Sequence, residues 1–461
     1  MKKSFRRIMW AVIALILVFV FYYAWVSLPI MTGFSAKQMC TCMFVSGRDQ
    51  KDIEANELGF FPLSFVKNNV NTGDSSVTSS VLGLARKKAI YREGIGCTLI
   101  NSVTEEQLES QIFSIPQVPP MNPDSVAWPH GDKISDTISS AIDKNKLNAA
   151  VDEAFTEPNP NKKQRTRAVV VVYDGQLVAE KYAPGYNMNS KMYGWSVAKS
   201  ITSALIGTLV KQGKLNILQP APVPEWIDDN DPRHAITIEN LLQQTSGLRF
   251  VENYTKASDV TNMLYKNDDM AAYTASRSIA HHPGSFFNYS GGNSNILSRI
   301  IRQTVGEKGY ASYPFNALFY KLGMYHTLLE PDASGTYVGS SYIMATARDF
   351  ARFGLLYYND GVWNDERILP QGWVKQTTTP PASNTLKNYG YQFWLNGFDK
   401  DHPSKIKYPD VPPDMFYCDG FGFQRIYIIP SGKLVIVRLG LTLDNSFDEN
   451  RFIKNIIASI K

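Results

Sequence analysis

The sequence is poor in the residues that hold metals, with 4 cysteines and 6 histidines among 461 residues. No pair of Cys or His stands near a second pair at the spacing of a zinc site. His281 and His282 are adjacent and cannot both point inward from a regular element, so a solvated loop is expected there. The sequence also has no Gly-rich phosphate loop and no basic stripe. We therefore expect no metal, no other cofactor and no nucleic-acid partner.

Charge is absent from one long stretch near the N-terminus. Residues 8–31 contain no charged side chain, and basic residues precede them at positions 2, 3, 6 and 7. A membrane-spanning helix needs about 20 apolar residues, whereas the apolar part of a signal peptide has about 7–15. No small-x-small cleavage site follows the run. The stretch thus predicts an uncleaved transmembrane helix with a cytoplasmic N-terminus.

The basic residues before this span place everything after residue 31 outside the cytoplasm, in the periplasm if the cell is Gram-negative. A cleaved signal and a secreted protein are the alternative. In an exported protein cysteines form disulfides, and Cys97 is expected to bond either Cys40 or Cys42. Such a bond would tie together the two ends of the N-terminal extension. The other interpretation is that these thiols are free and buried.

Proline marks a boundary in the chain beyond the span. Residues 116–124 (PQVPPMNPD) are typical of a linker. Before the linker, a helix is expected over 51–57 and hairpin-like strands within 77–100. The predicted domains are 1–31, the basic tip and anchor; 32–125, an accessory region with the linker; and 126–461, the main domain.

The main domain begins and ends with strands and has helices between them. Strands are predicted over 167–173 and 176–182, around the hairpin turn Asp174-Gly175, and over 423–429 and 434–439. Helices are predicted over 135–155, 196–212 and 447–460. This order predicts an α/β (α+β) domain in which one antiparallel sheet is flanked by helices and carries a helical lobe.

The stretch Ser196-Val197-Ala198-Lys199 carries the clearest chemical signal. Residues three apart on a helix share a face, so the Lys199 ammonium is expected beside the Ser196 hydroxyl. A serine hydroxyl is a weak nucleophile until a neighbouring group takes its proton, and lysine can do so when burial lowers its pKa. The free N–H groups of a helix start also favour the negative charge of acyl transfer. On the motif alone, a Ser N-cap followed by a solvated Lys is the alternative.

Four further segments accompany this motif, namely 236–248 (ITIENLLQQTSGL), 283–306 (PGSFFNYSGGNSNILSRIIRQTVG), 339–354 (GSSYIMATARDFARFG) and 420–424 (GFGFQ). In order and spacing they resemble the serine β-lactamase-related hydrolases, which include class C β-lactamases, D-alanyl-D-alanine carboxypeptidases, esterases and 6-aminohexanoate-dimer hydrolase. The resemblance covers about residues 126–461 and is closest to the esterase and 6-aminohexanoate-dimer hydrolase branch. It implies a β-lactamase/transpeptidase-like fold.

The resemblance implies a catalytic role for three side chains. Ser196 matches the nucleophile that forms an acyl-enzyme, Lys199 its proton partner and Tyr289 the general-base tyrosine. A nearby ammonium lowers the pKa of a phenol from its usual value of about 10, which would let tyrosine accept and return a proton. The alternative for Tyr289 is an aromatic residue that packs in its loop. The oxyanion hole is expected to use the backbone N–H groups of Ser196 and Phe421.

Two departures from the family bear on the substrate. Members that act on β-lactams or D-Ala-D-Ala carry Lys-Thr-Gly or His-Thr-Gly where this chain has Gly420-Phe421-Gly422, so the cation and hydroxyl for a substrate carboxylate are missing. The tyrosine motif of the family is usually Tyr-x-Asn. Here the nearest Asn after Tyr289 is Asn293, which either holds substrate or caps the following helix.

The sequence thus predicts a membrane-anchored, extracytoplasmic serine hydrolase that cleaves a small ester or amide through an acyl-enzyme. Gly420, Gly422 and Tyr254 are expected to contact the substrate, although Tyr254 also suits packing within its loop. A D-Ala-D-Ala carboxypeptidase or a β-lactamase is one alternative, and a non-catalytic binding protein of the cell envelope is another. An α/β-hydrolase is not supported, because Ala198 replaces the second glycine of the Gly-x-Ser-x-Gly elbow.

Overall fold

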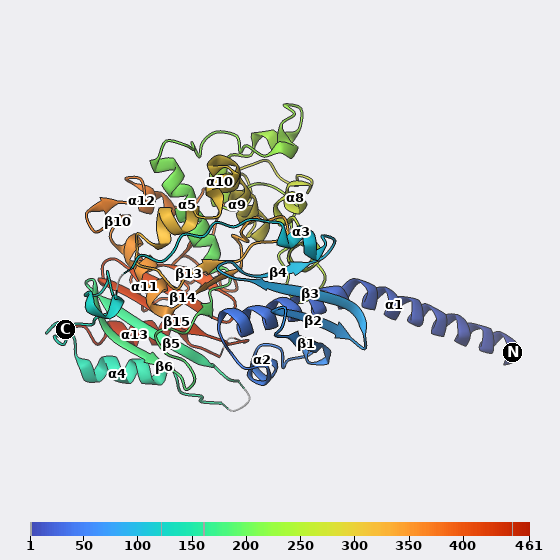
Figure 1. Ribbon diagram of the computed structural model, residues 1–461, viewed down its shortest axis with the longest axis horizontal. Coiled ribbons are helices and arrows are strands. Elements are labelled where there is room, and N and C mark those ends of the chain that lie inside the picture. Colours follow the sequence, from blue (N-terminus) through green and yellow to red (C-terminus); the bar gives the residue numbers. More distant parts are fainter. Residues whose placement is uncertain (1, 121, 160–161, 445) are drawn as a thin grey trace. The chain divides into compact units, whose positions relative to one another are not determined.

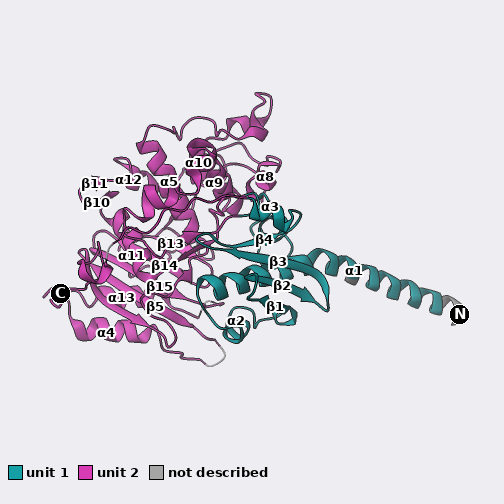
Figure 2. Cartoon of the chain, in the orientation of Figure 1, with its two compact units in different colours: residues 1–110, 251–269, 332–334 teal, residues 111–250, 270–331, 335–461 magenta. Residues whose placement is uncertain are grey.

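The computed structural model describes residues 2–120, 122–159, 162–444 and 446–461 and divides the chain into two compact units (Figure 2). Unit 1 comprises residues 1–110, 251–269 and 332–334, and unit 2 comprises residues 111–250, 270–331 and 335–461. Two short segments from the second half of the sequence therefore belong to unit 1. The domain boundaries proposed from the sequence, at residues 31 and 125, stay a prediction.

Unit 1 is built on a four-stranded antiparallel sheet in the order β1-β2-β3-β4 (Figure 1). Its strands are β1 (Lys67–Asn71), β2 (Ser76–Val81), β3 (Leu84–Arg92) and β4 (Gly96–Ile100). Its helices are α1 (Lys2–Cys40), α2 (Gln50–Asn56), α3 (Glu105–Glu109) and α7 (Asp259–Lys266). The helix predicted over 51–57 and the hairpin pattern within 77–100 are confirmed.

Helix α1 continues well beyond the apolar run that predicted it. Residues 5–19 and 21–23 are exposed, residues 24–31 are mostly half-buried, and from Thr32 onward the helix is almost entirely buried against unit 1. It packs along β3, β2 and α7. The segment 5–45 is long and apolar enough to cross a membrane. One helix thus includes both the candidate span and a core element of unit 1.

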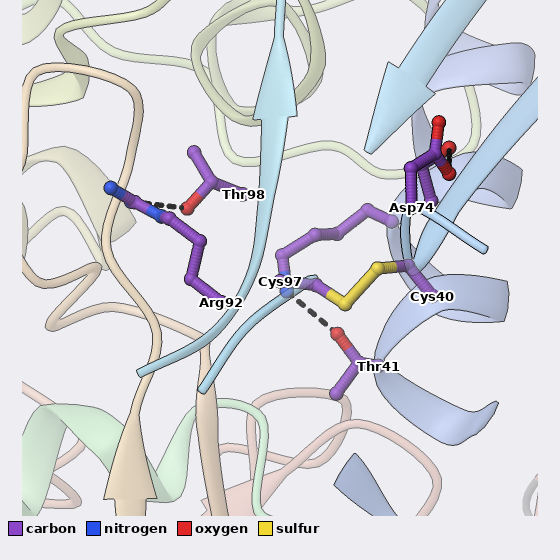
Figure 3. The surroundings of a disulfide bond; sticks show 8 residues. Cys40, Thr41, Asp74, Arg92, Cys97 and Thr98 are labelled. Atoms are coloured by element: carbon purple, nitrogen blue, oxygen red, sulfur yellow. Dashed lines mark hydrogen bonds between the residues drawn. A yellow bond between two sulfur atoms is a disulfide. The ribbon is translucent and has the colours of Figure 1, made fainter. Parts of the chain in front are cut away.

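A disulfide closes the buried end of α1 onto the sheet. Cys40, the last residue of α1, is bonded to Cys97 in β4, with 6.0 Å between their Cα atoms (Figure 3). Cys42 and Cys418 are buried cysteines outside this disulfide. Of the two pairings that the sequence left open for Cys97, the structure has the bond to Cys40, and the expected disulfide in this extension is confirmed.

Unit 2 contains a six-stranded antiparallel sheet in the order β12-β13-β14-β15-β5-β6. Its strands are β12 (Trp394–Leu395), β13 (Phe416–Gly420), β14 (Gln424–Ile429), β15 (Leu434–Gly440), β5 (Thr166–Tyr173) and β6 (Gln176–Tyr182). Both predicted hairpins are present, and the first and last parts of the domain meet where β15 pairs with β5. The expected antiparallel sheet is confirmed.

Helices cover both faces of this sheet. Side chains alternate along β5, so that Val170 and Val172 enter the core shared with α5 (Val197–Lys211) and α11 (Ala347–Tyr358), while Val169 and Val171 face the other way. The opposite face is covered by α4 (Lys144–Glu153) and α13 (Glu449–Ile457). The prediction of a helix over 135–155 was too long, because Asp143 caps α4 by accepting the backbone N–H groups of Asn145 and Lys146.

The helical lobe lies between β6 and β12 in the chain. It includes the helices α5, α6 (Ile238–Leu242), α8 (Met270–Ala275), α9 (Gly291–Val305), α10 (Glu307–Tyr310) and α12 (Trp373–Thr377). It also includes the small sheet β7-β9-β8, formed by Met192–Tyr193, Ile343–Ala345 and Leu328–Leu329, and the short hairpin of β10 (Val362–Trp363) and β11 (Glu366–Arg367).

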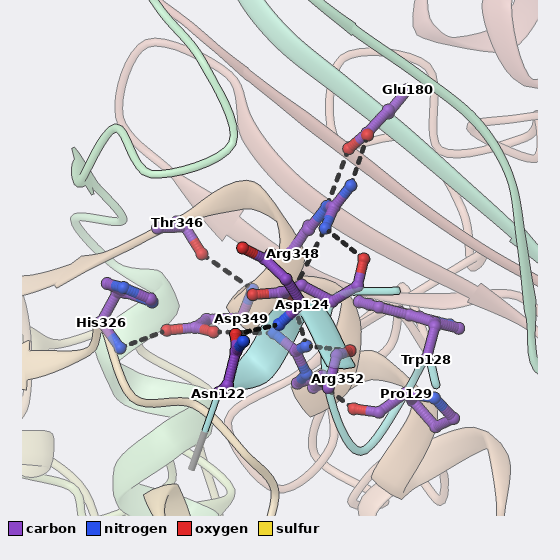
Figure 4. Close-up of polar contacts among 12 residues, drawn as sticks. Asn122, Asp124, Trp128, Pro129, Glu180, His326, Thr346, Arg348, Asp349 and Arg352 are labelled. Carbon is purple, nitrogen blue, oxygen red and sulfur yellow. Dashed lines mark hydrogen bonds and ion pairs between the residues drawn. The ribbon is translucent and has the colours of Figure 1, made fainter. Parts of the chain in front are cut away.

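A buried ionic network joins α11 to the loop before the main sheet (Figure 4). Arg348 pairs with Glu180 at 2.5 Å, and Arg352 pairs with Asp132 at 2.7 Å and with Asp349 at 3.1 Å. Burial acts to raise the pKa of Asp132, but the Arg352 and Arg348 guanidinium groups outweigh burial and lower it. The network fixes α11 against β6, and Phe350 of α11 lies against Gly194 in the turn before Ser196.

Candidate active site

Ser196 lies at the turn that leads from β7 into α5. It is the N-cap residue of α5, yet its side chain makes no capping hydrogen bond. The preceding Trp195 has φ of 49°, a left-handed conformation that bulky residues rarely adopt. Its ring stacks on Tyr193 at 4.7 Å and meets the edge of Phe421 at 5.6 Å. The turn therefore leaves the Ser196 hydroxyl free for chemistry instead of capping the helix.

Lys199 is almost completely buried, at 1% exposure, one turn after Ser196. Its Nζ lies 3.0 Å from Ser196 Oγ and 2.9 Å from the backbone oxygen of Ser340. The same nitrogen lies 4.9 Å from the centre of the Tyr289 ring. The structure thus brings together the three side chains that the sequence proposed for catalysis. Sequence reasoning singled out the segment 339–354 but missed the Ser340 carbonyl, because a backbone acceptor has no sequence signal.

Tyr289 lies in the loop that enters α9, directly before the N-cap residue Ser290. Its ring packs against Tyr389 at 5.7 Å and Trp394 at 5.3 Å. The Ser290 hydroxyl accepts the N–H of Asn293, which fixes the backbone at the start of the helix. The helix cap and the two aromatic contacts therefore hold the half-buried phenol ring beside the Lys199 ammonium.

A buried network of amide side chains supports the loop that carries Tyr289. Gln244 Oε1 accepts the Ser290 N–H at 3.1 Å and the Asn293 side-chain amide at 2.8 Å, and the Ser246 hydroxyl donates to Asn293 Oδ1 at 2.9 Å. Gln392 accepts from Gln244 at 3.3 Å and thereby links the loop to a distant segment. The helix cap is Ser290, whereas Asn293 is 1% exposed with both sides of its amide engaged. A contact between Asn293 and substrate stays a prediction.

The segment Gly420-Phe421-Gly422 forms the turn between β13 and β14. A Cβ on Gly420 would lie 2.1 Å from the Gly194 oxygen, so only glycine allows the end of β13 to approach the turn before Ser196. Gly422 has φ of 76° and Phe423 has φ of 64°, and this left-handed pair starts β14 one residue later than predicted. Phe421 is 45% exposed. The turn therefore brings the peptide expected to serve as oxyanion donor close to the turn that carries Ser196.

Two β14 side chains hold this turn, and sequence reasoning did not identify them. The Gln424 side chain donates to the Phe421 oxygen at 3.0 Å. Arg425 Nη1 donates to the Gly420 oxygen at 3.3 Å, and Arg425 Nε donates to Glu449 at 2.6 Å. Because the Gly420 oxygen and the Phe421 N–H belong to one planar peptide group, Arg425 helps to set the direction of that N–H.

Tyr254 belongs to unit 1, where its hydroxyl donates to Glu252 at 2.8 Å and its side chain is 49% exposed. Its predicted contact with substrate stays a prediction.

In the part of the chain that the structure describes, no group of three or more His, Cys, Asp or Glu side chains could hold a metal ion. The assembled groups of unit 2 are a hydroxyl, a buried ammonium, a phenol and a glycine-bounded turn, a set suited to acyl transfer.

Comparison with known proteins gives the fold and the family. A 6-aminohexanoate-dimer hydrolase of Paenarthrobacter ureafaciens is 22% identical over 301 residues, which cover 59% of this chain and 72% of that protein. A Bacillus anthracis structure assigned provisionally as a 6-aminohexanoate-dimer hydrolase has a TM-score of 0.57 at 22% identity, covering 76% of this chain and 90% of its own. A family VIII carboxylesterase has a TM-score of 0.55 at 15% identity, covering 71% and 99%.

The β-lactamase/transpeptidase-like fold predicted from the sequence is therefore confirmed, as is the expected kinship with hydrolases of this group. The model of the Beta-lactamase family matches residues 151–453, which hold the main sheet, the lobe and the Ser196 turn. The chain belongs to the beta-lactamase family and is a serine hydrolase.

Proposed function

We propose that this protein is a membrane-anchored hydrolase that cleaves a small ester or amide outside the cytoplasm, through an acyl-enzyme on Ser196. The observation that carries the proposal is the position of Lys199 Nζ, within 3.0 Å of Ser196 Oγ and 2.9 Å of the Ser340 oxygen, with the Tyr289 ring beside it. In this proposal Lys199 acts as a cation beside the two oxygens, and proton transfer belongs to the Tyr289 phenol.

In the first half of the reaction, Tyr289 as phenolate takes the proton from Ser196 as the hydroxyl attacks the substrate carbonyl. The Lys199 ammonium stabilises the phenolate, and the N–H groups of Ser196 and Phe421 stabilise the oxyanion. Tyr289 then gives its proton to the leaving alcohol or amine. In the second half, water repeats the sequence at the acyl-enzyme, and the Ser196 hydroxyl is restored.

The glycines at 420 and 422 support a substrate without an essential carboxylate. No cation or hydroxyl stands at these positions, and Phe421, 45% exposed, presents an apolar ring next to Trp195. The relative from Paenarthrobacter ureafaciens is named for 6-aminohexanoate dimer, in which an amide bond joins the two units. We propose small acyl esters and short amides as the substrates of this chain.

Helix α1 and the disulfide support the proposed location. The apolar segment 5–45 is long enough to span a bilayer, and its exposed first half has no core to pack against within unit 1. The Cys40–Cys97 disulfide fits an oxidising compartment. Together they favour an N-terminal anchor with both units on the extracytoplasmic side.

The test is hydrolysis of p-nitrophenyl butyrate by the full chain in detergent micelles, compared with the Ser196→Ala variant. We expect activity in the parent and a loss of about 10⁴-fold or more in kcat in the variant, because the nucleophile is gone. The matched control is Ser203→Ala, which removes a buried hydroxyl about two turns later on the same helix and should leave kcat unchanged.

Equal activity in the parent and Ser196→Ala would refute the assignment of the nucleophile. A folded parent that does not hydrolyse esters or short amides but is labelled by fluorescent penicillin would favour a carboxypeptidase or β-lactamase. Absence of turnover and of labelling would favour a binding protein of the envelope.

A further inference from the structure

Outside α1, the four most exposed large apolar side chains that the structure describes in unit 1 lie in two loops, whereas Val251 and Tyr254, about half exposed, lie elsewhere in the unit. Leu82 is 94% exposed and Leu84 is 62% exposed at the turn between β2 and β3, while Phe61 and Phe65 are 81% and 64% exposed in the loop before β1. The two phenyl rings contact each other edge to face, at 6.0 Å. Clustered exposure of this degree marks a site of interaction.

Both loops lie at the same end of the four-stranded sheet. Val81 pairs with Leu84 around the two-residue turn, which places Leu82 at the extreme tip of this hairpin. Lys67, the first residue of β1, pairs with Ser80 one residue before the end of β2. Residues 61–66 therefore enter the sheet beside the hairpin tip, and the four apolar side chains lie at the same end of the sheet.

Helix α1 leaves unit 1 at this same end of the sheet (Figure 1). The Thr32 hydroxyl donates to the Ala85 oxygen at 2.6 Å, next to the hairpin tip, and the Ser35 hydroxyl donates to Asn68 at 2.7 Å. Eight residues later, Cys40 is bonded to Cys97, which pairs with Tyr91 near the far end of β3. Helix α1 thus enters unit 1 at the hairpin tip and runs along β3 away from it.

The geometry of α1 indicates how far the tip of the β2–β3 hairpin lies from the hydrocarbon layer. If the hydrocarbon layer begins at Ile8, about 20 residues carry the helix across it, and the layer ends near Leu28. At a rise of about 1.5 Å per residue, Thr32 then lies about 6 Å beyond that boundary. From Ala85 the strand extends back toward the membrane by about 3.3 Å per residue, so the hairpin tip reaches the level of the boundary.

Basic side chains stand beside the apolar ones. Lys67 and Arg86 are exposed, the first at the start of β1 and the second two residues after Leu84. This arrangement of apolar side chains at the tip with cations just behind them matches the layering of a bilayer, in which phosphates lie outside the acyl chains.

We infer that unit 1 makes a second membrane contact, in which loops 61–65 and 82–84 enter the interface of the bilayer that holds α1, with Lys67 and Arg86 against lipid phosphates. The inference rests on the proposed anchoring by α1. The contact holds unit 1 on the membrane surface at two points in addition to the helix, so that the unit does not pivot freely about a single helix.

The test uses the full chain reconstituted into vesicles of phosphatidylethanolamine and phosphatidylglycerol in equal parts. Leu82→Cys is labelled with the polarity-sensitive dye NBD; the native thiols of Cys42 and Cys418 are buried and are not expected to react in the folded protein. The matched control is Thr72→Cys, in the exposed turn between β1 and β2 at the opposite end of the sheet. We expect blue-shifted emission at 82, quenched by lipids with a nitroxide on the upper acyl chain, and polar emission at 72, quenched by aqueous iodide.

The outcomes separate this contact from the anchor. If the protein stays in the vesicles after alkaline extraction but the dye at 82 is as polar and as accessible to iodide as the dye at 72, the second contact is refuted and the anchor stands. If the protein is released by alkaline extraction, the proposed anchoring itself fails, and the contact fails with it. A blue shift at 82 in vesicles that the nitroxide lipids do not quench would indicate protein association and would likewise overturn the inference.

Discussion

Replacement of Glu449 by glutamine tests how the buried end of β13 is held. The Glu449 carboxylate is 8% exposed and accepts hydrogen bonds from Arg425 Nε and the Tyr427 hydroxyl, both at 2.6 Å, and from the Tyr408 hydroxyl at 3.1 Å. Burial acts to raise its pKa, but the cations of Arg425 and Lys407 outweigh burial and lower it to about 2. The charged form is therefore strongly favoured in the folded protein.

The lowered pKa gives the size and the sign of the effect. Compared with the ordinary value of 4.5, a pKa of about 2 corresponds to about 3 kcal/mol of stability. A depressed carboxyl pKa stabilises the fold fully above the unfolded value of 4.5, and that contribution is lost as the pH falls toward about 2. We therefore expect Glu449→Gln to lower the free energy of unfolding by about 3 kcal/mol near neutral pH.

The assay is urea unfolding of the parent and variant in detergent micelles, followed by tryptophan fluorescence at a series of pH values. The difference between the two proteins should shrink between pH 4.5 and about 2, because the parent then loses its charged carboxylate. The matched control is Glu153→Gln, which breaks an exposed ion pair with Arg451 and should cost about 0.5 kcal/mol or less. A stability difference that does not change with pH, or a loss no larger than that of the control, would refute the reasoning.

Three further predictions concern the site and unit 1. Tyr289→Phe keeps the ring but removes the phenol, so kcat for p-nitrophenyl butyrate should fall about 10²–10⁴-fold with an unchanged melting temperature; a parent-like kcat would exclude the general-base role. Gly420→Ala places a Cβ 2.1 Å from the Gly194 oxygen and should reduce kcat in a protein whose circular dichroism is retained; unaltered kinetics would contradict the close approach. Cys97→Ser opens a disulfide with a sequence separation of 57, and urea unfolding of unit 1 should show a loss of about 4 kcal/mol, whereas an unchanged midpoint would show that the bond contributes nothing.

Local features of the sequence were sufficient to predict the regular elements of unit 2. Alternation along 167–173 and the Asp174-Gly175 pair predicted the hairpin, and the structure has both residues at positive φ in that turn. The apolar pattern from Ser196 predicted α5 to within one residue at each end. These signals are local, because strand alternation, turn chemistry and helix periodicity depend on neighbouring residues alone.

The sequence failed at one helix start and at the points where an interaction between distant residues decided the outcome. Asp143 ends the predicted helix over 135–155 on its N-terminal side by capping α4, although its position in the pattern gave no such sign. The segments 251–269 and 332–334 belong to unit 1 because α7 packs against α1 and Ala333 packs with Leu108. No shift in composition along the chain marks the points at which it passes from one unit to the other.

The sequence by itself determined the fold class, the nucleophile candidate and its neighbour, since Ser196 and Lys199 need only one helical turn to meet. Only the tertiary structure decided what surrounds them. The Ser340 oxygen on Lys199, the aromatic support of Tyr289, and the Arg425 side chain at the Gly420 peptide all join segments far apart in the chain. Such contacts depend on how helices and strands pack in space, and backbone acceptors and buried ion pairs are specified by that packing, not by any local pattern.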